Sequence, residues 1–407
     1  MSRALLTVTL MALALGCADA PSAPPPVDAT VNDVTADATL DGSGEASAMD
    51  APTADVVDEN RIVVPSDVPA VGDPLAWDVR RRGPFHTGYR LLSLTYTPRG
   101  STTPRTLPVH VWYPTHAIAG PHPVYGRFFR DPEAVTDAPI APPAHPMGYP
   151  LQVYSHGDHG FGGTTHVLMR YFASHGWVTV APDHIGNTLF DTPTPRPFNI
   201  NHLRPQDVRA ALEFVASLPA SDPLAGRCVV SRTLLTGHSY GTHTVWSGVG
   251  ATYDVDAVAR RCTMDSTCTA DDRAVMRGSL GDPRFVAGIP MAGSISRDLF
   301  GADGHRSVMV PILAMSGTAD PVGAETQFMT TAPVDLTWID IQGACHQFFA
   351  LGGCEAIPDS FQDTIMGAWA MAFARRHVLG DNDATVRAIL DGTMSLSDRV
   401  SFHRRTP

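Results

Sequence analysis

The 407-residue sequence predicts an α/β fold: a mostly parallel central sheet with helices on both faces and an antiparallel N-terminal edge. Three observations lead to this prediction. From about residue 77 onward, short apolar segments alternate with segments of helical period, as in strands joined by crossover helices. The first two apolar segments are separated by a short turn-rich stretch, which fits an antiparallel pair. The composition, 43% hydrophobic and 17% charged, fits a globular protein with a sizeable core.

The expected strands are short and apolar and are bounded by Gly, Pro or polar residues. They span residues 91–96, 109–113, 149–154, 177–181, 228–236, 285–291, 311–316 and 336–341. The expected helices span residues 164–175, 205–218 and 360–378. Two stretches, 120–146 and 253–283, interrupt the alternation, and we expect them to form walls or a small lid over the site.

The chain divides into four predicted parts. Residues 1–17 read as a signal peptide, 18–75 as an acidic tether rich in Pro, Ala and Asp, 76–395 as the catalytic domain and 396–407 as a C-terminal tail. The first 60 residues contain one Arg and ten Asp or Glu, so most of the net charge of −12 lies there. A segment with so few apolar residues cannot offset the entropy of ordering it. We therefore expect the tether to be disordered.

The N-terminus indicates export. Arg3 precedes an apolar run over residues 4–15 that is too short to span a bilayer as a mature helix. The run ends at Cys17, in a context that resembles the lipobox of bacterial lipoproteins, although Ala14 occupies the place usually held by Leu. We expect lipidation of Cys17, attachment to a membrane and a location in the cell envelope, at the outer membrane or cell surface. The alternative is cleavage by an ordinary signal peptidase near Ala18 or Ala20, which would give a freely secreted protein.

The cysteines are expected to form disulfides, because export implies an oxidising compartment. Five cysteines follow the expected lipidation site, and four of them lie in close pairs. We predict the bridges Cys262–Cys268 and Cys345–Cys354, with Cys228 left as a buried thiol. A Cys228–Cys262 bridge is the competing arrangement.

The charged residues exclude several functions. All 29 basic residues are arginine, so mechanisms that need a lysine are ruled out, among them Schiff-base formation and the Walker phosphate lysine. Outside the acidic N-terminal stretch the chain is close to neutral, which predicts no nucleic-acid partner. We expect no cofactor and no metal, and a monomer.

The main chemical motif is Gly-His-Ser-Tyr-Gly over residues 237–241, at the end of an apolar strand. In Gly-x-Ser-x-Gly, the serine sits on a tight strand-to-helix turn that lifts its hydroxyl above the sheet, as in α/β-hydrolases. Gly237 and Gly241 leave room for neighbouring backbone, and the following helix adds its N-terminal partial charge. Ser239 is therefore the predicted nucleophile.

The acid and the base follow the nucleophile in the order that this fold requires. Asp320 comes just after the strand at 311–316, and His346 comes just after the strand at 336–341. His346 is the expected general base, and Asp320 the residue that orients it. Asp335 and Asp340 are weaker alternatives, because they lie at or within a strand.

An acyl-transfer site also needs backbone donors for the oxyanion. One is expected to be the N–H of Tyr240, the residue after the nucleophile. The other should come from the loop after an early strand, where Ser-His-Gly-Asp ends in Asp158.

Several segments together resemble the platelet-activating factor acetylhydrolase and predicted dienelactone hydrolase group of α/β-hydrolases, and also cutinase-like polyesterases. The resemblance runs from about Gly83 to Gly392. It rests on residues 108–114 (PVHVWYP), 154–157 (YSHG), 173–177 (ASHGW), 181–188 (APDHIGNT), 237–241 (GHSYG) and 343–347 (GACHQ).

Two departures from these families narrow the prediction. Dienelactone hydrolases use a cysteine nucleophile, whereas this chain has Ser239. In the acetylhydrolases the acid follows the strand equivalent to residues 285–291, but here Ala-Gly-Ser follows it, so Asp320 is the better candidate, as in the polyesterases. We expect a serine esterase that cleaves short acyl esters of lipids or polyesters. The alternatives are a peptidase or amidase on the same triad and a non-catalytic surface-binding lipoprotein.

Overall fold

The computed structural model describes residues 60–68 and 70–407. The predicted signal peptide, Cys17 and residues 18–59 of the predicted tether lie outside the described residues. The described residues belong to one compact unit.

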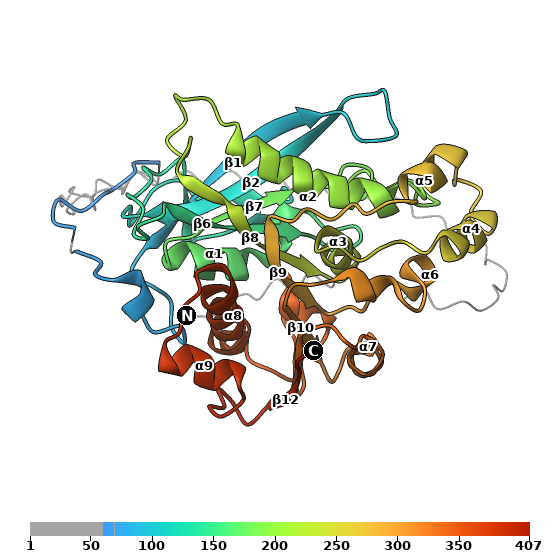
Figure 1. Cartoon of the computed structure of the whole chain (residues 1–407). Helices are drawn as coiled ribbons and strands as arrows, with labels where there is room; N and C mark the ends of the chain where they lie inside the picture. Colours follow the sequence, from blue (N-terminus) through green and yellow to red (C-terminus); the bar gives the residue numbers. More distant parts are fainter. Residues whose placement is uncertain (1–59, 69) are drawn as a thin grey trace, which may run out of the picture. The chain divides into compact units, whose positions relative to one another are not determined.

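The unit is built on a ten-stranded sheet (Figure 1). In chain order its strands are β1 (His86–Tyr96), β2 (Arg105–Thr115), β5 (Ala134–Thr136), β6 (Tyr149–Ser155), β7 (Val178–Pro182), β8 (Cys228–His238), β9 (Phe285–Met291), β10 (Ile312–Gly317), β11 (Leu336–Ile341) and β12 (Val400–Arg405). Their order across the sheet is β12-β11-β10-β9-β8-β6-β7-β2-β1-β5. A separate small hairpin pairs β3 (Val124–Tyr125) with β4 (Phe129–Arg130).

The sheet is mostly parallel, as predicted. The six strands from β6 to β11 run parallel to one another, so their carboxyl ends meet at one edge of the sheet. β1 and β2 form an antiparallel pair, and β2 lies antiparallel to β7. The predicted fold class, an α/β-hydrolase-like sheet with an antiparallel N-terminal side, is confirmed. One detail differs, because the short strand β5 pairs with β1 and forms the outermost edge there.

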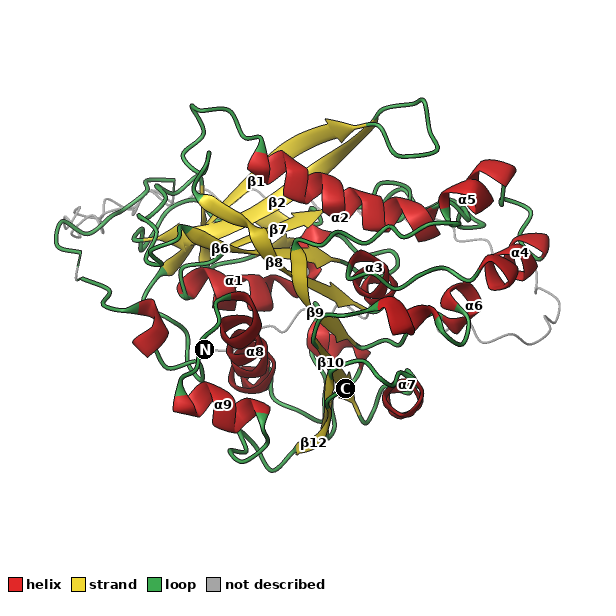
Figure 2. Ribbon diagram, in the orientation of Figure 1, coloured by secondary structure: helices red, strands yellow, loops and turns green. Residues whose placement is uncertain are grey.

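Helices cover both faces of the sheet (Figure 2). One face carries α1 (His166–Ser174), α8 (Ala368–Val378) and α9 (Ala384–Leu390). The other face carries α2 (Ile200–Ala216), α3 (Gly241–Gly248), α4 (Val255–Thr263), α5 (Ala270–Val275), α6 (Arg297–Phe300) and α7 (Ala324–Thr330). Shorter helical turns lie at Pro74–Ala76, Gly162–Thr165, Gly304–Ser307, His346–Phe349 and Gln362–Gly367.

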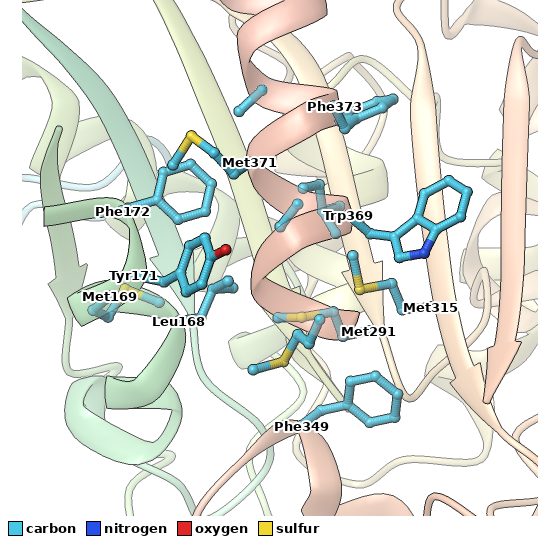
Figure 3. Close-up of a cluster of buried hydrophobic side chains, with 14 of the residues drawn as sticks. Leu168, Met169, Tyr171, Phe172, Met291, Met315, Phe349, Trp369, Met371 and Phe373 are labelled. Atoms are coloured by element: carbon cyan, nitrogen blue, oxygen red, sulfur yellow. The ribbon is translucent and has the colours of Figure 1, made fainter. Parts of the chain in front are cut away.

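The sheet separates two apolar cores, because successive side chains of a strand point to opposite faces. In β8, Leu234 belongs to the core under α1 and α8, and Leu235 belongs to the core under α2 and α3. Figure 3 shows the first core, where Trp369 and Phe373 lie on one side of α8 and Phe172 of α1 lies on its other side, all three in contact with the same buried cluster. Burying each such aromatic side chain contributes about 1.5–3 kcal/mol, so this contact fixes α8 on the sheet.

Both predicted ends of the catalytic domain need correction. Residues 396–407 are not a separate tail, because β12 pairs antiparallel with β11 and Phe402 stacks on Trp369. The adjoining arginines make this segment too polar to stand out as a strand. At the other end, residues 60–75 were expected in the tether, but Val63 bridges to Ala119 and Ile62 packs on a small buried cluster.

The two predicted disulfides, Cys262–Cys268 and Cys345–Cys354, are both present. Cys228 is a free thiol, so the competing Cys228–Cys262 bridge is excluded. It is partly rather than fully buried, which corrects the prediction of a buried thiol. Burial raises the pKa of the Cys228 thiol to about 12, which leaves it protonated at neutral pH.

Candidate active site

Ser239 lies on a strained turn between β8 and α3. β8 ends at His238, α3 begins at Gly241, and Ser239 itself has a φ of 54°. A non-glycine residue in the left-handed region costs free energy and persists only where its surroundings hold it. Here the Ser239 N–H donates to the Met291 carbonyl at 2.9 Å. The turn has the backbone geometry expected of a nucleophile elbow.

Two glycines make this turn possible, because neighbouring backbone comes too close to them to leave room for a side chain. A Cβ on Gly241 would lie 2.1 Å from the Ser155 carbonyl oxygen, and one on Gly237 would lie 2.4 Å from the Gly241 oxygen. Both distances are well inside van der Waals contact. The two glycines of the sequence motif are therefore required by packing between β8, α3 and the end of β6.

Asp320 and His346 come together at the same edge of the sheet. Asp320 follows β10 and His346 follows β11, and the Asp320 carboxylate lies 2.8 Å from His346 Nδ1. The Asp320 side chain is 9% exposed and that of His346 is 36% exposed. Because the carboxylate can only accept, Nδ1 carries the proton, which leaves Nε2 as an acceptor. This is the arrangement that a histidine base needs.

His238 joins the elbow to the loop that carries His346. Its Nε2–H donates to the His346 carbonyl at 3.1 Å, and the two rings have centroids 4.7 Å apart. Burial, with a smaller effect of the neighbouring His346, lowers the pKa of His238 to about 3. His238 is therefore neutral and serves as a fixed donor. Within the described residues no hydrogen bond joins Ser239 Oγ to His346, and unliganded sites often hold this pair loosely.

The two expected oxyanion donors belong to segments that adjoin Ser239. Tyr240 precedes the first residue of α3, and Asp158 lies in the loop after β6. In the described part of the chain neither backbone N–H has a hydrogen-bond partner. Gly157, next to Asp158, packs so closely on the elbow that an added Cβ would lie 3.1 Å from Ser239 Cβ. The loop after β6 is thus in direct contact with Ser239.

The Asp158 carboxylate is neutralised by its neighbours. It accepts a hydrogen bond of 2.5 Å from Asn187 Nδ2 and pairs with Arg196 at 2.9 Å. Burial raises the pKa of Asp158, but these two partners outweigh it, so the pKa lies below its ordinary range. The charge is therefore compensated by Arg196, which also lies over the Tyr240 ring at 4.3 Å.

The alternative acids do not reach His346. Asp340 accepts from Ser316 Oγ at 2.7 Å, and Asp335 is paired with Arg404 at 3.8 Å. Burial raises the pKa of Asp335. Of the three aspartates considered from the sequence, only Asp320 contacts the histidine.

A second Ser-His-Asp chain, which the sequence reasoning missed, lies beneath the site. Ser155 Oγ is 2.9 Å from His184 Nε2, and His184 Nδ1 is 2.8 Å from the Asp207 carboxylate. All three residues are fully buried. No substrate can reach Ser155, so this chain cannot be the catalytic one. The sequence feature that could have indicated this chain is Asp207, a charged residue among the apolar positions of the predicted helix at 205–218.

Among residues 60–68 and 70–407, no group of three His, Cys, Asp or Glu side chains is placed to hold a metal ion. In the same residues, no helix has the length and apolar character needed to cross a membrane.

No protein-family model matches the chain, and no match is found among curated proteins. The function must therefore be inferred from the geometry of the site.

Proposed function

We propose that this protein is a serine hydrolase that cleaves carboxylic esters through an acyl-enzyme on Ser239. The observation that carries the proposal is the 2.8 Å Asp320–His346 pair, held at the sheet edge where Ser239 occupies its left-handed turn. A strained serine beside an oriented histidine is the arrangement that acyl transfer requires.

The reaction follows from the roles of these groups. His346 Nε2 takes the Ser239 proton while Oγ attacks the ester carbonyl carbon, and the carbonyl oxygen becomes an anion. The N–H groups of Tyr240 and Asp158 stabilise this anion. The tetrahedral intermediate collapses, the C–O bond to the alcohol breaks, and His346 returns the proton to the leaving alkoxide. Water then repeats the sequence on the acyl-enzyme and releases the acid.

The proposed substrates are short acyl esters of lipids or polyesters. The resemblance of the sequence motifs to acetylhydrolases and cutinase-like polyesterases supports this class. The cavity of about 410 Å³ near the loop after β6 does not bear on it, because neither Ser239 nor His346 is among the residues that line it.

The proposed location is outside the cytoplasm, with the mature chain attached to the cell envelope through lipidated Cys17. Two disulfides support an oxidising compartment. Palmitate labelling of the full chain and of Cys17→Ser in a bacterial host tests the anchor, which predicts label only in the parent.

The proposal is tested with purified full-length chain and p-nitrophenyl esters from acetate to decanoate. We expect hydrolysis and fluorophosphonate labelling by the parent, and loss of both in Ser239→Ala. Ser247→Ala is a matched control, because Ser247 lies on the same helix α3 but is bonded to Tyr253. Activity that survives in Ser239→Ala overturns the mechanism. A parent that neither hydrolyses the esters nor takes the label favours a binding protein instead, and cleavage of p-nitroanilides alone favours an amidase.

A further inference from the structure

Arg204 is an arginine of α2 that is buried completely under the loop after β6. All its hydrogen bonds go to uncharged oxygens. These are the backbone carbonyls of His156 and Gly157 (3.4 Å to the latter), the side-chain oxygen of Asn187 (2.5 Å), and the hydroxyls of Ser155 (3.2 Å) and Thr244 (3.4 Å). The guanidinium therefore contacts both the loop after β6 and helix α3, which are the two segments that carry the expected oxyanion donors.

These contacts fix the direction of the Asp158 N–H. The Gly157 carbonyl accepts from Arg204, from His156 Nδ1 at 2.7 Å and from the Gly160 N–H at 3.2 Å. The peptide between Gly157 and Asp158 is trans, so its N–H points opposite to its carbonyl. Because the carbonyl is turned toward Arg204, the Asp158 N–H faces away from the buried guanidinium.

The buried serine chain holds the same loop from the other side. His184 donates its backbone N–H to His156 Nε2 at 2.9 Å, so His156 must carry its proton on Nδ1 and donate it to the Gly157 carbonyl. The side chain of His184 is fixed in turn by Ser155 and Asp207. Every rotatable group around the Gly157 carbonyl therefore has one defined orientation.

The charge of Arg204 has no directly bonded counter-ion among the described residues. Two carboxylates act on Arg204 without bonding to it, and both have other partners: Asp158 is bonded to Arg196 at 2.9 Å, and Asp207 to Arg105 at 2.8 Å and Tyr96 at 2.6 Å. Burial lowers the pKa of Arg204 to about 10, so the guanidinium remains charged at neutral pH. A buried positive charge without a bonded partner is unfavourable in the resting protein, and a negative charge that develops nearby relieves this.

We propose that Arg204 is the positioning residue of the oxyanion hole: it holds the His156 and Gly157 carbonyls inward, so that the Asp158 N–H meets the substrate oxyanion, and its buried charge favours that anion. This inference rests on the proposed function of Ser239 as an acylated nucleophile.

The test compares Arg204→Met and Arg204→Lys with the parent. Arg90→Met is a matched control, since Arg90 is a mostly buried arginine of β1 paired with Asp222. The readouts are kcat, KM, and the inhibition constant of an alkyl trifluoromethyl ketone, to which Ser239 adds to give a tetrahedral oxyanion. Thermal unfolding shows that each variant is folded.

Losing one oxyanion donor typically lowers kcat by about 10²–10³-fold. We expect a loss of at least about 10²-fold in kcat for Arg204→Met, with KM within about twofold and a matching loss of ketone affinity. Arg204→Lys keeps the charge but not the forked geometry, so we expect a loss of about tenfold. Arg90→Met should leave kcat within about twofold of the parent.

The outcomes separate the two proposals. Absence of Ser239-dependent hydrolysis in the parent overturns the proposed function, and this inference falls with it. An active parent with kcat retained in Arg204→Met, or with a change in KM alone, overturns only the role of Arg204. A loss of kcat in Arg204→Met without a matching loss of ketone affinity also overturns only the role of Arg204. If Arg204→Met does not fold, the result for Arg204→Lys decides. Full activity with unchanged ketone affinity in Arg204→Lys overturns the positioning role of Arg204. A loss of about tenfold in both kcat and ketone affinity supports that role.

Discussion

Four buried histidines predict that this protein unfolds in mild acid. Burial lowers the pKa of His238 to about 3 and the pKa values of His166, His175 and His243 to about 4. In the unfolded chain each imidazole titrates at about 6.5. Between these values the unfolded chain binds protons that the folded protein does not. Stability is therefore complete above about pH 6.5 and is lost as the pH falls toward 4.

The size of the loss follows from these pKa values. At pH 5.5 each histidine lowers the free energy of unfolding by about 1.3 kcal/mol relative to pH 7.5, and the four together lower it by about 5 kcal/mol. At pH 4.5 the loss is about 2.5 kcal/mol each, or about 10 kcal/mol in all. A domain has about 5–15 kcal/mol of stability in total. We therefore expect the acid transition near pH 4.5–5.

The assay is urea unfolding of the full chain, followed by tryptophan fluorescence, at pH 7.5, 6.5 and 5.5. Between pH 6.5 and 5.5 these four histidines should contribute about three protons to the uptake on unfolding. His243→Gln removes one of these groups, so its stability should depend on pH less steeply, by about one proton. A loss of less than about 2 kcal/mol between pH 7.5 and 5.5 in the parent would refute the reasoning. An unchanged slope in His243→Gln would refute it for that residue.

Three further predictions concern the site. Asp320→Asn should lower kcat by about 10⁴-fold with little change in the thermal midpoint, because His346 loses the acceptor that fixes its tautomer; steady-state kinetics and thermal unfolding check this. Replacing Cys345 and Cys354 together by Ser should lower the free energy of unfolding by about 2–3 kcal/mol, given their sequence separation of 9. The same replacement should lower kcat, because the bridge flanks His346. Urea unfolding and steady-state kinetics check these two effects. Gly241→Ala should cost about 3 kcal/mol or more, since the new Cβ meets the backbone at the end of β6, and a normal thermal midpoint would contradict the packing argument.

Much of the sheet could be predicted because its central strands are continuous apolar runs. β9 and β11 have the same bounds as the strands expected at 285–291 and 336–341. β5 could not be predicted because it has only three residues, and β12 because it is polar; both are edge strands defined by what they pair with. The start of α2 was expected at Pro205 but lies at Ile200, because tertiary contacts accommodate a proline within the helix.

Some residues of the candidate site could likewise be predicted from the sequence, and others could not. Ser239, Asp320 and His346 could be found because each follows a strand whose carboxyl end lies at one edge of the sheet. Arg204 could not be found, because nothing in its sequence neighbourhood separates a buried arginine from one on the exposed face of a helix. Its contacts span the loop after β6, the loop after β7 and α3, which only the folded chain brings together.

The two Ser-His-Asp chains show that hydrogen bonds alone do not make a nucleophile. The Ser155–His184–Asp207 chain has both of its bonds at 2.8–2.9 Å, whereas the part of the chain that the structure describes shows no hydrogen bond between Ser239 and His346. Ser155, however, lies within β6 and is fully buried, so no carbonyl carbon can approach it, while Ser239 is partly exposed on a turn with a φ of 54°. Arg204 donates to the hydroxyl of Ser155 and to the carbonyl that precedes Asp158. On the proposed role of Arg204, the buried chain is the scaffold that keeps the oxyanion donor of the exposed site in place.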